Sequence, residues 1–291
     1  MRVAVVLALV AVGTVVFHFL SPWWWTPLAS NWGYIDRTII ITFWITGVVF
    51  VAVVLFIAYC VLRFHHREGR RAAYEPENKK LEWWLSGLTA VGVVAMLAPG
   101  LFVWMDFVTV PDEATEFEVV GQQWQWSFRL PGKDGQLGTS DPRNVSFENP
   151  FGLNPDDPHG QDDVLIDGDD LHLPLDKPVK VLLRSLDVLH DFYVPQFRAK
   201  MDLVPGMVTY FWFVPTRAGT FDILCFELCG TGHYAMRGKV VVEDERAYQA
   251  WLQEQQTFAQ SLAEAGNGAG GALNLALSEG EAGSAGEDPA R

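Results

Sequence analysis

The sequence predicts a chain of two structural classes, with transmembrane helices in its first third and an all-β domain after them. Three observations lead to this prediction. Two long stretches near the N-terminus contain no charged residue. After Asp106 the chain breaks into short apolar segments, several alternating with polar residues, that Pro, Gly or Asp separate, which is the pattern of β-strands. Only 19% of the 291 residues are charged, below the roughly 25% typical of soluble domains.

A transmembrane helical hairpin is expected over residues 31–110. The charge-free stretches are Thr38 to Leu62, with 25 residues, and Trp83 to Met105, with 23. Each exceeds the ~20 residues that a helix needs to cross the hydrocarbon core. Both are apolar all round, which argues against buried helices of a soluble core. Tryptophans flank them as an interfacial belt does: Trp32, Trp83, Trp84 and Trp104.

Residues 1–30 form either a first transmembrane helix or a secretory signal peptide. The apolar run Val3 to Leu20 follows Arg2, as in a signal peptide. However, Pro27 to Ala29 is a poor cleavage site, and the aromatic cluster Trp23 to Trp25 is typical of a membrane boundary. These features favour a retained helix.

The orientation follows from the charges of the loops. Arg63 to Lys80 carries six Lys and Arg residues, whereas Ser21 to Arg37 carries one. The positive-inside rule therefore places the loop after the first hairpin helix in the cytoplasm. We expect a multi-pass protein of the inner (cell) membrane, with the chain after Asp106 on the outer, periplasmic side.

Residues 111–261 are expected to form the exported domain. Several short strands separated by turn residues favour a β-sandwich or a small barrel. The expected strands are Thr115–Val120, Gln123–Leu130, Leu171–Leu175, Val179–Leu186, Met207–Val214, Thr220–Leu224 and Lys239–Val242.

Three segments of this region differ from the strand pattern. Residues 131–170 are rich in Gly, Pro and Asp and are interpreted as an acidic, solvated surface insertion; they lack the ligand spacing of the helix-loop-helix calcium site. Residues 247–264 are expected to form a short amphipathic helix. Residues 262–291 are expected to form a disordered acidic tail, since they are dominated by Gly, Ala, Ser and Glu without an aromatic residue.

The exported domain carries nearly all of the net charge of −14. Asp106 to Ser261 contains 25 acidic and 12 basic residues, a net charge of 12 − 25 = −13. This balance argues against nucleic acid as a partner, because phosphate binding needs Lys and Arg. Two interpretations stay open: a solvated surface, or a docking face that steers a basic partner.

A cluster of soft ligands carries the chemistry. Cys225, Cys229, His233 and Met236 fall within twelve residues, and His190 precedes them. Sulfur with imidazole selects copper or zinc over hard cations. A disulfide leaves the imidazoles and the thioether unexplained, and a Cys2His2 zinc site has no use for the thioether. A copper electron-transfer site uses all of these side chains.

These residues resemble the motifs of subunit II of the haem–copper cytochrome c oxidases, which carries the binuclear copper A centre. The resemblance covers nearly the whole chain and implies a cupredoxin-like Greek-key sandwich. The most specific motif is Cys225-x-Glu227-x-Cys229-Gly230-x-x-His233-x-x-Met236. The others are Ser185-x-Asp187-Val188-x-His190, Pro195 and Lys200-x-Asp202-x-x-Pro205-Gly206.

The resemblance also implies a ligand set for two copper ions. Cys225 and Cys229 are expected to bridge both coppers. His190 and Met236 are expected to complete one copper, and His233 with the backbone carbonyl of Glu227 the other. The Glu227 carboxylate is expected to bind a magnesium ion shared with the catalytic subunit.

Two further residues receive roles from the resemblance. Trp124 lies in a segment similar to the family's aromatic motif, which implies that it receives electrons from cytochrome c. The segment departs from the family pattern at Gln122 and Gln125, which leaves the details of the docking surface open. Glu82 opens the last membrane helix and resembles a glutamate at the mouth of a proton channel, although the Trp-Thr pair usual in the family is out of register.

The function implied is that of the electron-accepting subunit of a respiratory terminal oxidase. Electrons from cytochrome c are expected to reach haem in catalytic subunit I, where oxygen is reduced to water and protons are translocated; subunit III is a further expected partner, and lipid surrounds the helices. The alternatives are the copper A subunit of a nitric oxide reductase and a membrane-anchored copper chaperone. A quinol oxidase subunit is disfavoured because members that accept quinol generally lack these ligands.

Overall fold

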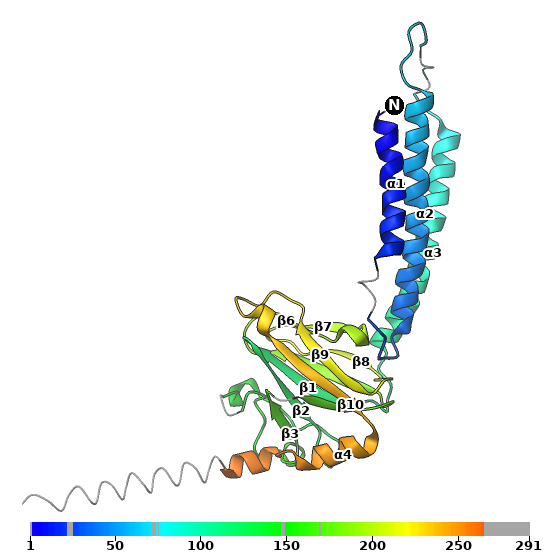
Figure 1. The fold of residues 1–291 in the computed structure, drawn as a ribbon. Helices are drawn as coiled ribbons and strands as arrows, with labels where there is room; N and C mark the ends of the chain where they lie inside the picture. The colour runs from blue at the N-terminus through cyan, green and yellow to red at the C-terminus, as the bar shows by residue number, and fades with distance from the viewer. Residues whose placement is uncertain are drawn as a thin grey trace, which may run out of the picture. The chain divides into compact units, whose positions relative to one another are not determined.

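A computed structural model describes residues 2–21, 26–71, 74, 76–146, 149–168 and 170–264. Its chain divides into two compact units, Met1–Thr109 and Val110–Arg291. The first unit is helical and the second consists mainly of β-strands (Figure 1). The expected membrane boundary at Trp23 to Trp25 and residues 265–291 of the expected tail lie outside the described residues, whereas residues 262–264 of that tail are helical.

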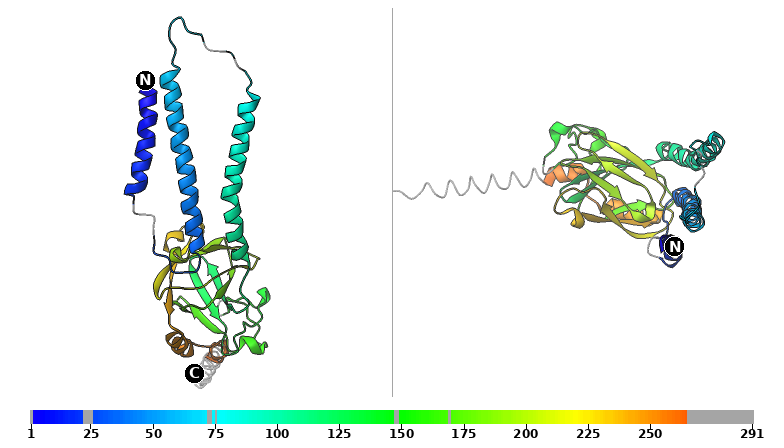
Figure 2. Two further views of the ribbon diagram at one scale, coloured as in Figure 1. Left: turned by 90° about the vertical axis from the view of Figure 1, so that its right-hand side faces the viewer. Right: turned by 90° about the horizontal axis from the view of Figure 1, so that it is seen from above.

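The helical unit contains three long apolar helices. They are α1 (Arg2–Leu20), α2 (Gly33–Arg63) and α3 (Lys79–Val108), and each is long and apolar enough to cross a membrane. This confirms the predicted transmembrane helices. The Asn78 side chain caps α3 by accepting a hydrogen bond from the Leu81 backbone N–H at 3.1 Å. Helix α1 lies beside α2 (Figures 1 and 2); that α1 is retained in the mature protein stays a prediction.

Two five-stranded sheets form the second unit. Their strand orders are β3-β2-β1-β5-β8 and β4-β10-β9-β6-β7. Both are mixed, because β1 pairs in parallel with β5 and β10 in parallel with β4. The bounds are β1 (Thr115–Gln122), β2 (Gln125–Leu130), β3 (Val164–Asp167), β4 (Leu171–Pro174), β5 (Val179–Ser185), β6 (His190–Tyr193), β7 (Lys200–Leu203), β8 (Thr209–Phe213), β9 (Gly219–Cys225) and β10 (Arg237–Glu243).

Aromatic side chains join the two sheets across the core. Trp126 on β2 meets Phe192 on β6 edge to face, with ring centroids 5.7 Å apart, and Phe192 also contacts Phe211 on β8 at 6.2 Å. All three side chains are buried. Strand β5 shows why the sheets fold this way, since every second residue from Val179 on is buried. The predicted β-sandwich is confirmed.

Three of the strands differ from the sequence-based expectation. The sequence does not predict β3, β6 and β7, which are short strands of four residues each, interspersed with acidic or polar side chains. The predicted strand Gln123–Leu130 is also too long: Gln123 and Trp124 form the turn between β1 and β2. Trp124 therefore stands at the end of the sheet with 40% of its surface exposed, and is not a core tryptophan.

The interpretation of residues 131–170 as a solvated insertion holds only in part among the residues that the structure describes, because many are exposed whereas others are buried against the sandwich. Arg129 of β2 donates to Asp163 at 2.9 Å and pairs with Glu118 of β1 at 2.6 Å, and all three residues are buried. Phe151 and Leu153 are also buried. A charged residue is buried only when it is paired, so this pairing explains how an acidic segment packs against the sandwich.

The predicted helix over residues 247–264 is divided in two. Helix α4 (Glu245–Glu254) begins two residues earlier, where the Asp244 side chain accepts from the Ala247 backbone N–H at 3.0 Å. The chain then forms an isolated bridge between Thr257 and Val164 before residues 258–264 resume a helix. The helix is interrupted here because the backbone of Thr257 pairs with Val164 of strand β3.

Candidate metal centre

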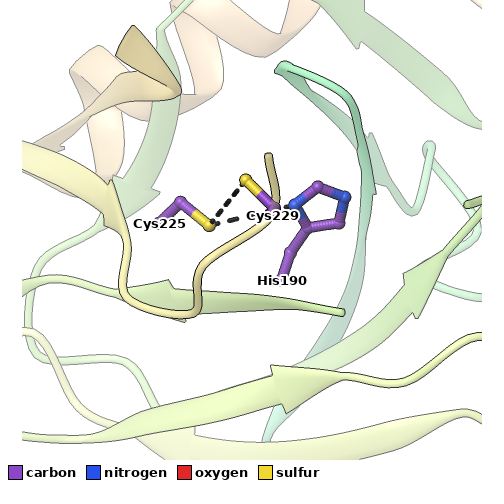
Figure 3. Close-up of side chains that lie close together, drawn as sticks. All are labelled: His190, Cys225 and Cys229. Carbon is purple, nitrogen blue, oxygen red and sulfur yellow. Dashed lines mark hydrogen bonds between the residues drawn. The ribbon is translucent and has the colours of Figure 1, made fainter. Parts of the chain in front are cut away.

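The soft ligands come together at one end of the second sheet. His190 is the first residue of β6 and Cys225 the last of β9. Cys229 lies in the loop after β9, His233 opens a short 3-10 turn, and Met236 precedes β10. Phe192 pairs with Cys225 across β6 and β9, and this register brings His190 to the cysteine loop (Figure 3).

The distances describe one compact cluster. The sulfur atoms of Cys225 and Cys229 are 3.7 Å apart, and both thiols are free, so no disulfide joins them. The Nδ1 atom of His190 lies 3.8 Å from the Cys225 sulfur. The sulfur atom of Cys229 in turn lies 3.6 Å from Nδ1 of His233 and 3.9 Å from the sulfur of Met236.

The backbone of Glu227 also belongs to this cluster. Its carbonyl oxygen lies 3.2 Å from the Cys225 sulfur, which places an oxygen donor beside the two thiols. The Glu227 side chain is partly buried. Thus all six residues of the expected copper ligand set contribute an atom to one location.

The two thiols differ in acidity although they are neighbours. Burial raises the pKa of Cys225, but contacts led by that with His190 outweigh burial and lower it to about 6. Burial, and the proximity of the Cys225 sulfur, raise the pKa of Cys229 to about 11. The pocket therefore accommodates one negative charge readily and opposes a second. A cation between the sulfurs supplies the charge that the second thiolate needs.

His190 is held by a carboxylate on its far side. Its Nε2 atom lies 2.9 Å from Oδ1 of Asp187, while Oδ2 of Asp187 accepts from the Gln123 backbone N–H at 2.7 Å. Because the carboxylate can only accept, Nε2 carries the proton of the neutral ring, and the lone pair of Nδ1 is then available to a metal on the side of the sulfurs. Burial acts to raise the pKa of Asp187, but these hydrogen bonds lower it overall.

The turn at Trp124 is fastened to the ligand loop. The carbonyl oxygen of Cys229 accepts from Nε2 of Gln123 at 2.7 Å and from Nε1 of Trp124 at 3.3 Å. A Cβ atom on Gly232 would lie 2.3 Å from Cδ2 of the Trp124 ring, so only glycine allows this packing. Sequence reasoning missed Gln123 and Gly232, because their partners lie about a hundred residues away in the chain.

An ion pair between a buried aspartate and an exposed lysine supports the ligand loop. Asp191, which follows His190, is fully buried and pairs with Lys200 of β7. The backbone carbonyl of Asp191 accepts from the Phe226 N–H at 3.1 Å, directly after Cys225. These bonds link β6, β7 and the start of the ligand loop, so the cluster rests on a braced backbone.

Glu82, the remaining residue singled out from the sequence, belongs to the helical unit. It lies in the first turn of α3 and is exposed. It therefore takes no part in the cluster of the β unit.

The donor set fits copper. Two thiols, two imidazoles, a thioether and a carbonyl oxygen converge, and His190, Cys225, Cys229 and Met236 are buried. Soft thiolate and thioether ligands with imidazole select copper, whereas a closed zinc site takes four ligands. Six donors in total, the two adjacent thiols included, exceed the four that one tetrahedral ion uses.

Comparisons with known proteins agree with this chemistry. A family model described as cytochrome c oxidase subunit II, periplasmic domain, matches residues 116–244. The alternative cytochrome c oxidase subunit 2 of Bradyrhizobium diazoefficiens is 74% identical over 259 residues, which are 89% of this chain and 94% of that protein. Cytochrome c oxidase subunit 2 of Cereibacter sphaeroides is 31% identical over 243 residues, 79% of this chain and 77% of that protein.

A solved structure is also similar. The periplasmic domain of subunit II of cytochrome oxidase from Bradyrhizobium japonicum is 26% identical, and the match covers 50% of this chain and 95% of that chain with a TM-score of 0.37.

Proposed function

The chain belongs to the cytochrome c oxidase subunit II family, and from this premise we propose that it is the electron-accepting subunit of a respiratory terminal oxidase. It accepts electrons from reduced cytochrome c and delivers them to haem in a separate catalytic subunit, where oxygen is reduced to water and protons are translocated. The observation that carries the proposal is the cluster of Cys225, Cys229 and His190, whose ligand atoms all lie within 4.8 Å of one another.

The proposed metal centre is a pair of copper ions. Cys225 and Cys229 would hold both ions, His190 and Met236 would complete the ligand set of one ion, and His233 with the Glu227 carbonyl would complete that of the other. Bound copper would supply one-electron transfer at this site. The chain's own contribution is rigidity: Asp187 fixes the tautomer of His190, and the Asp191–Lys200 pair braces the loop.

Trp124 is proposed as the residue at which electrons arrive. Its ring is 40% exposed, and its Nε1 atom donates to the carbonyl of Cys229. This hydrogen bond connects a solvent-facing ring to a proposed copper ligand. Leu228 and Tyr234 flank Cys229 and His233 in the chain and are exposed, and we propose that they add apolar contact surface for the docking partner.

The remaining roles concern the assembled complex. The Glu227 carboxylate is proposed to bind a magnesium ion shared with catalytic subunit I, and subunit III is a further proposed partner. Glu82 is proposed to stand at the mouth of a proton channel. The membrane is proposed to be the inner (cell) membrane, with the β unit on the periplasmic side.

The relatives favour this function over the alternatives. Both relatives described above are named as cytochrome c oxidase subunits, and neither as a nitric oxide reductase or a copper chaperone. The decisive comparison is the partner subunit: co-purification of this chain with a catalytic subunit that consumes oxygen supports the oxidase, whereas a partner that reduces nitric oxide contradicts it.

The copper proposal is tested by electron paramagnetic resonance of the full chain. The copper-loaded protein is expected to bind two coppers and to show one unpaired electron shared by both nuclei. Cys225→Ser and Cys229→Ser should each abolish that shared signal. Cys60→Ser changes the third cysteine, which lies in α2, and serves as the matched control. A single localised copper in the unaltered protein would overturn the assignment.

A further inference from the structure

The ring of His190 is in close contact with residues that take no part in the ligand set. His190 is fully buried, with Nε2 beside Asp187 and Nδ1 beside the Cys225 sulfur. These polar contacts orient the two nitrogen atoms. The torsion that turns a histidine ring about its Cβ–Cγ bond is nevertheless broad, so the plane of the ring depends on what packs against its carbon atoms.

A glycine of the first sheet makes room for this ring. A Cβ atom on Gly121 of β1 would lie 3.2 Å from Cδ2 and 3.4 Å from Cγ of His190, and 3.0 Å from Cδ2 of Leu203. The backbone of Gly121 is held on both sides, because it pairs with Trp126 on β2 and with Ser185 on β5. An added methyl group at this position would therefore press on the imidazole.

The indole of Trp126 packs against the same imidazole from the neighbouring strand. The ring centroids of Trp126 and His190 are 6.3 Å apart with an angle of 64° between the planes. Trp126 also meets Phe192, which lies two positions after His190 on β6 and therefore on the same face of the strand. A Cβ atom on Gly238 of β10 would lie 3.3 Å from Cδ1 of Trp126, so the indole itself is closely packed.

The contact between Trp126 and His190 is one of shape. Within the residues that the structure describes, the buried Nε1 atom of Trp126 has no hydrogen-bond partner. A phenyl ring can therefore replace the indole without breaking a hydrogen bond in that part of the chain. An aliphatic side chain, in contrast, loses the edge-to-face contact that aromatic rings make.

We infer that Gly121 and Trp126 form a seat that sets the plane of the His190 ring, which makes both of them positioning residues for the proposed copper centre. The inference rests on the proposed function, because it treats His190 as a ligand. Asp187 determines which nitrogen carries the proton, and the seat determines where the lone pair of the other nitrogen points. A ligand whose direction is fixed before the metal arrives loses less freedom on binding, so the seat strengthens copper binding.

Three variants and one control separate the seat from general packing. Gly121→Ala presses on the imidazole, Trp126→Leu removes the aromatic contact, and Trp126→Phe retains a ring. Phe213→Leu is the matched control, because it also removes a buried ring of the sandwich, one whose aromatic contacts are with Phe197 and Phe211. All four are made in the full chain, and circular dichroism verifies that each is folded.

The first measurement needs no metal. Nuclear magnetic resonance of the full chain with ¹⁵N-labelled histidine reports the tautomer of His190, whose signals are assigned by their loss in His190→Asn. At a pH that keeps the ring neutral, the unaltered protein should show the proton on Nε2. In Gly121→Ala and Trp126→Leu the ring tilts away from Asp187, so the shifts of the two nitrogens should approach each other. Unchanged shifts in both variants would overturn the inference.

The second measurement uses the copper-loaded chain. Copper affinity, measured by competition with a chelator, should fall about tenfold in Gly121→Ala and Trp126→Leu, the lower end of what residues that support metal ligands contribute. Trp126→Phe should restore most of it, and Phe213→Leu should bind as the unaltered protein does. Equal losses in Phe213→Leu and Trp126→Leu would show that the indole acts only through the stability of the fold.

Electron nuclear double resonance of the same samples distinguishes the two histidine ligands. In Gly121→Ala and Trp126→Leu the nitrogen coupling of one histidine should change while that of the other stays. Equal changes in both couplings would mean a general loosening of the ligand loop and contradict the seat. If the unaltered protein binds no copper pair, the proposed function fails, and the measurement on the metal-free chain still decides whether Gly121 and Trp126 orient His190.

Discussion

The Nε2 atom of His190 lies 2.9 Å from Oδ1 of Asp187, and its Nδ1 atom lies 3.8 Å from the sulfur of Cys225. One ring nitrogen is thus committed to a carboxylate and the other faces the proposed copper pair. Such a carboxylate fixes the tautomer of a ligand histidine and raises its basicity. The consequence is that Asp187, which binds no metal itself, should control how tightly the site holds copper.

Replacing Asp187 with Asn should weaken copper binding. The amide must present a donor either to His190 or to the Gln123 N–H, both of which already donate, so one hydrogen bond is lost. We expect a loss of copper affinity of about 10-fold to 100-fold, measured by competition with a copper chelator. Asp222→Asn, at an exposed position of β9, is the control. Equal affinity of the two variants would show that the carboxylate does not orient the imidazole.

Replacing Gly232 with Ala should slow electron transfer without removing copper. The added methyl group would lie 2.3 Å from the Trp124 ring, so the ring must move away from the Cys229 carbonyl. We expect the rate of reduction by cytochrome c to fall roughly tenfold, as misplacement of a reacting group does, in stopped-flow measurements. Thr231→Ala, in the same loop, adds no volume and should react normally. A normal rate in Gly232→Ala would count against Trp124 as the point of arrival.

Replacing Arg129 with Met should destabilise the β unit. The change leaves Asp163 buried without its cation and deprives Glu118 of one of its two arginine partners, the other being Arg184. Removing one partner of a buried ion pair costs about 3–5 kcal/mol. Urea unfolding of the full chain in detergent, followed by circular dichroism, measures the effect. Arg143→Met breaks an exposed pair with Asp141 and should unfold as the unaltered protein does; similar midpoints for both variants contradict the prediction.

Asp163 should make stability depend on pH. Burial raises its pKa from 3.8 to about 6, against the opposing attraction of Arg129. Between about pH 4 and pH 6 the folded state holds a proton that the unfolded state has lost, so stability falls as the pH rises through this window. Compared with Asp163→Asn, the unaltered protein should therefore lose stability from pH 4 to pH 6 and stay level above. Parallel pH profiles for the two proteins would refute the assignment.

Replacing Glu82 with Gln should slow oxygen reduction in the assembled complex while copper content stays unchanged. The proposed role is to deliver protons, and an amide cannot ionise. Glu77→Gln changes an exposed acid just before the same helix and should leave turnover unaltered. Oxygen consumption of the two variants, normalised to copper, decides between a channel residue and an ordinary interfacial charge.

The ligand loop could be predicted because its information is local. Four of the proposed ligand side chains lie between Cys225 and Met236, and their chemistry is legible in the residue types alone. The contacts that orient them are not local: Gln123 reaches the Cys229 carbonyl across 106 positions. The spacing of residues in the sequence does not indicate such a contact. Residues that orient the ligands, such as Gln123, can therefore be identified only in the folded structure.

The failures among the strands have a related cause. β6 and β7 are short segments whose pairing is decided by the neighbouring strands, and Asp191 is buried there only because Lys200 pairs with it. Likewise, Asp163 appears solvent-facing in the sequence, since its partner Arg129 lies 34 positions away. Sequence patterns therefore fail to identify which charged residues of this protein are buried. Long apolar helices and strands with alternating burial, such as β5, are predicted well.

The segment at Thr257 and Phe258 covers an edge strand of the first sheet. β3 ends the first sheet, and an uncovered strand is a template for pairing with another molecule. Thr257 bridges Val164 of β3, and the buried Phe258 ring packs with Phe151 and Leu153. A shortened form of the protein that stops before residue 257 would therefore lose this cover and become prone to self-association, whereas one that extends to Glu264 keeps it.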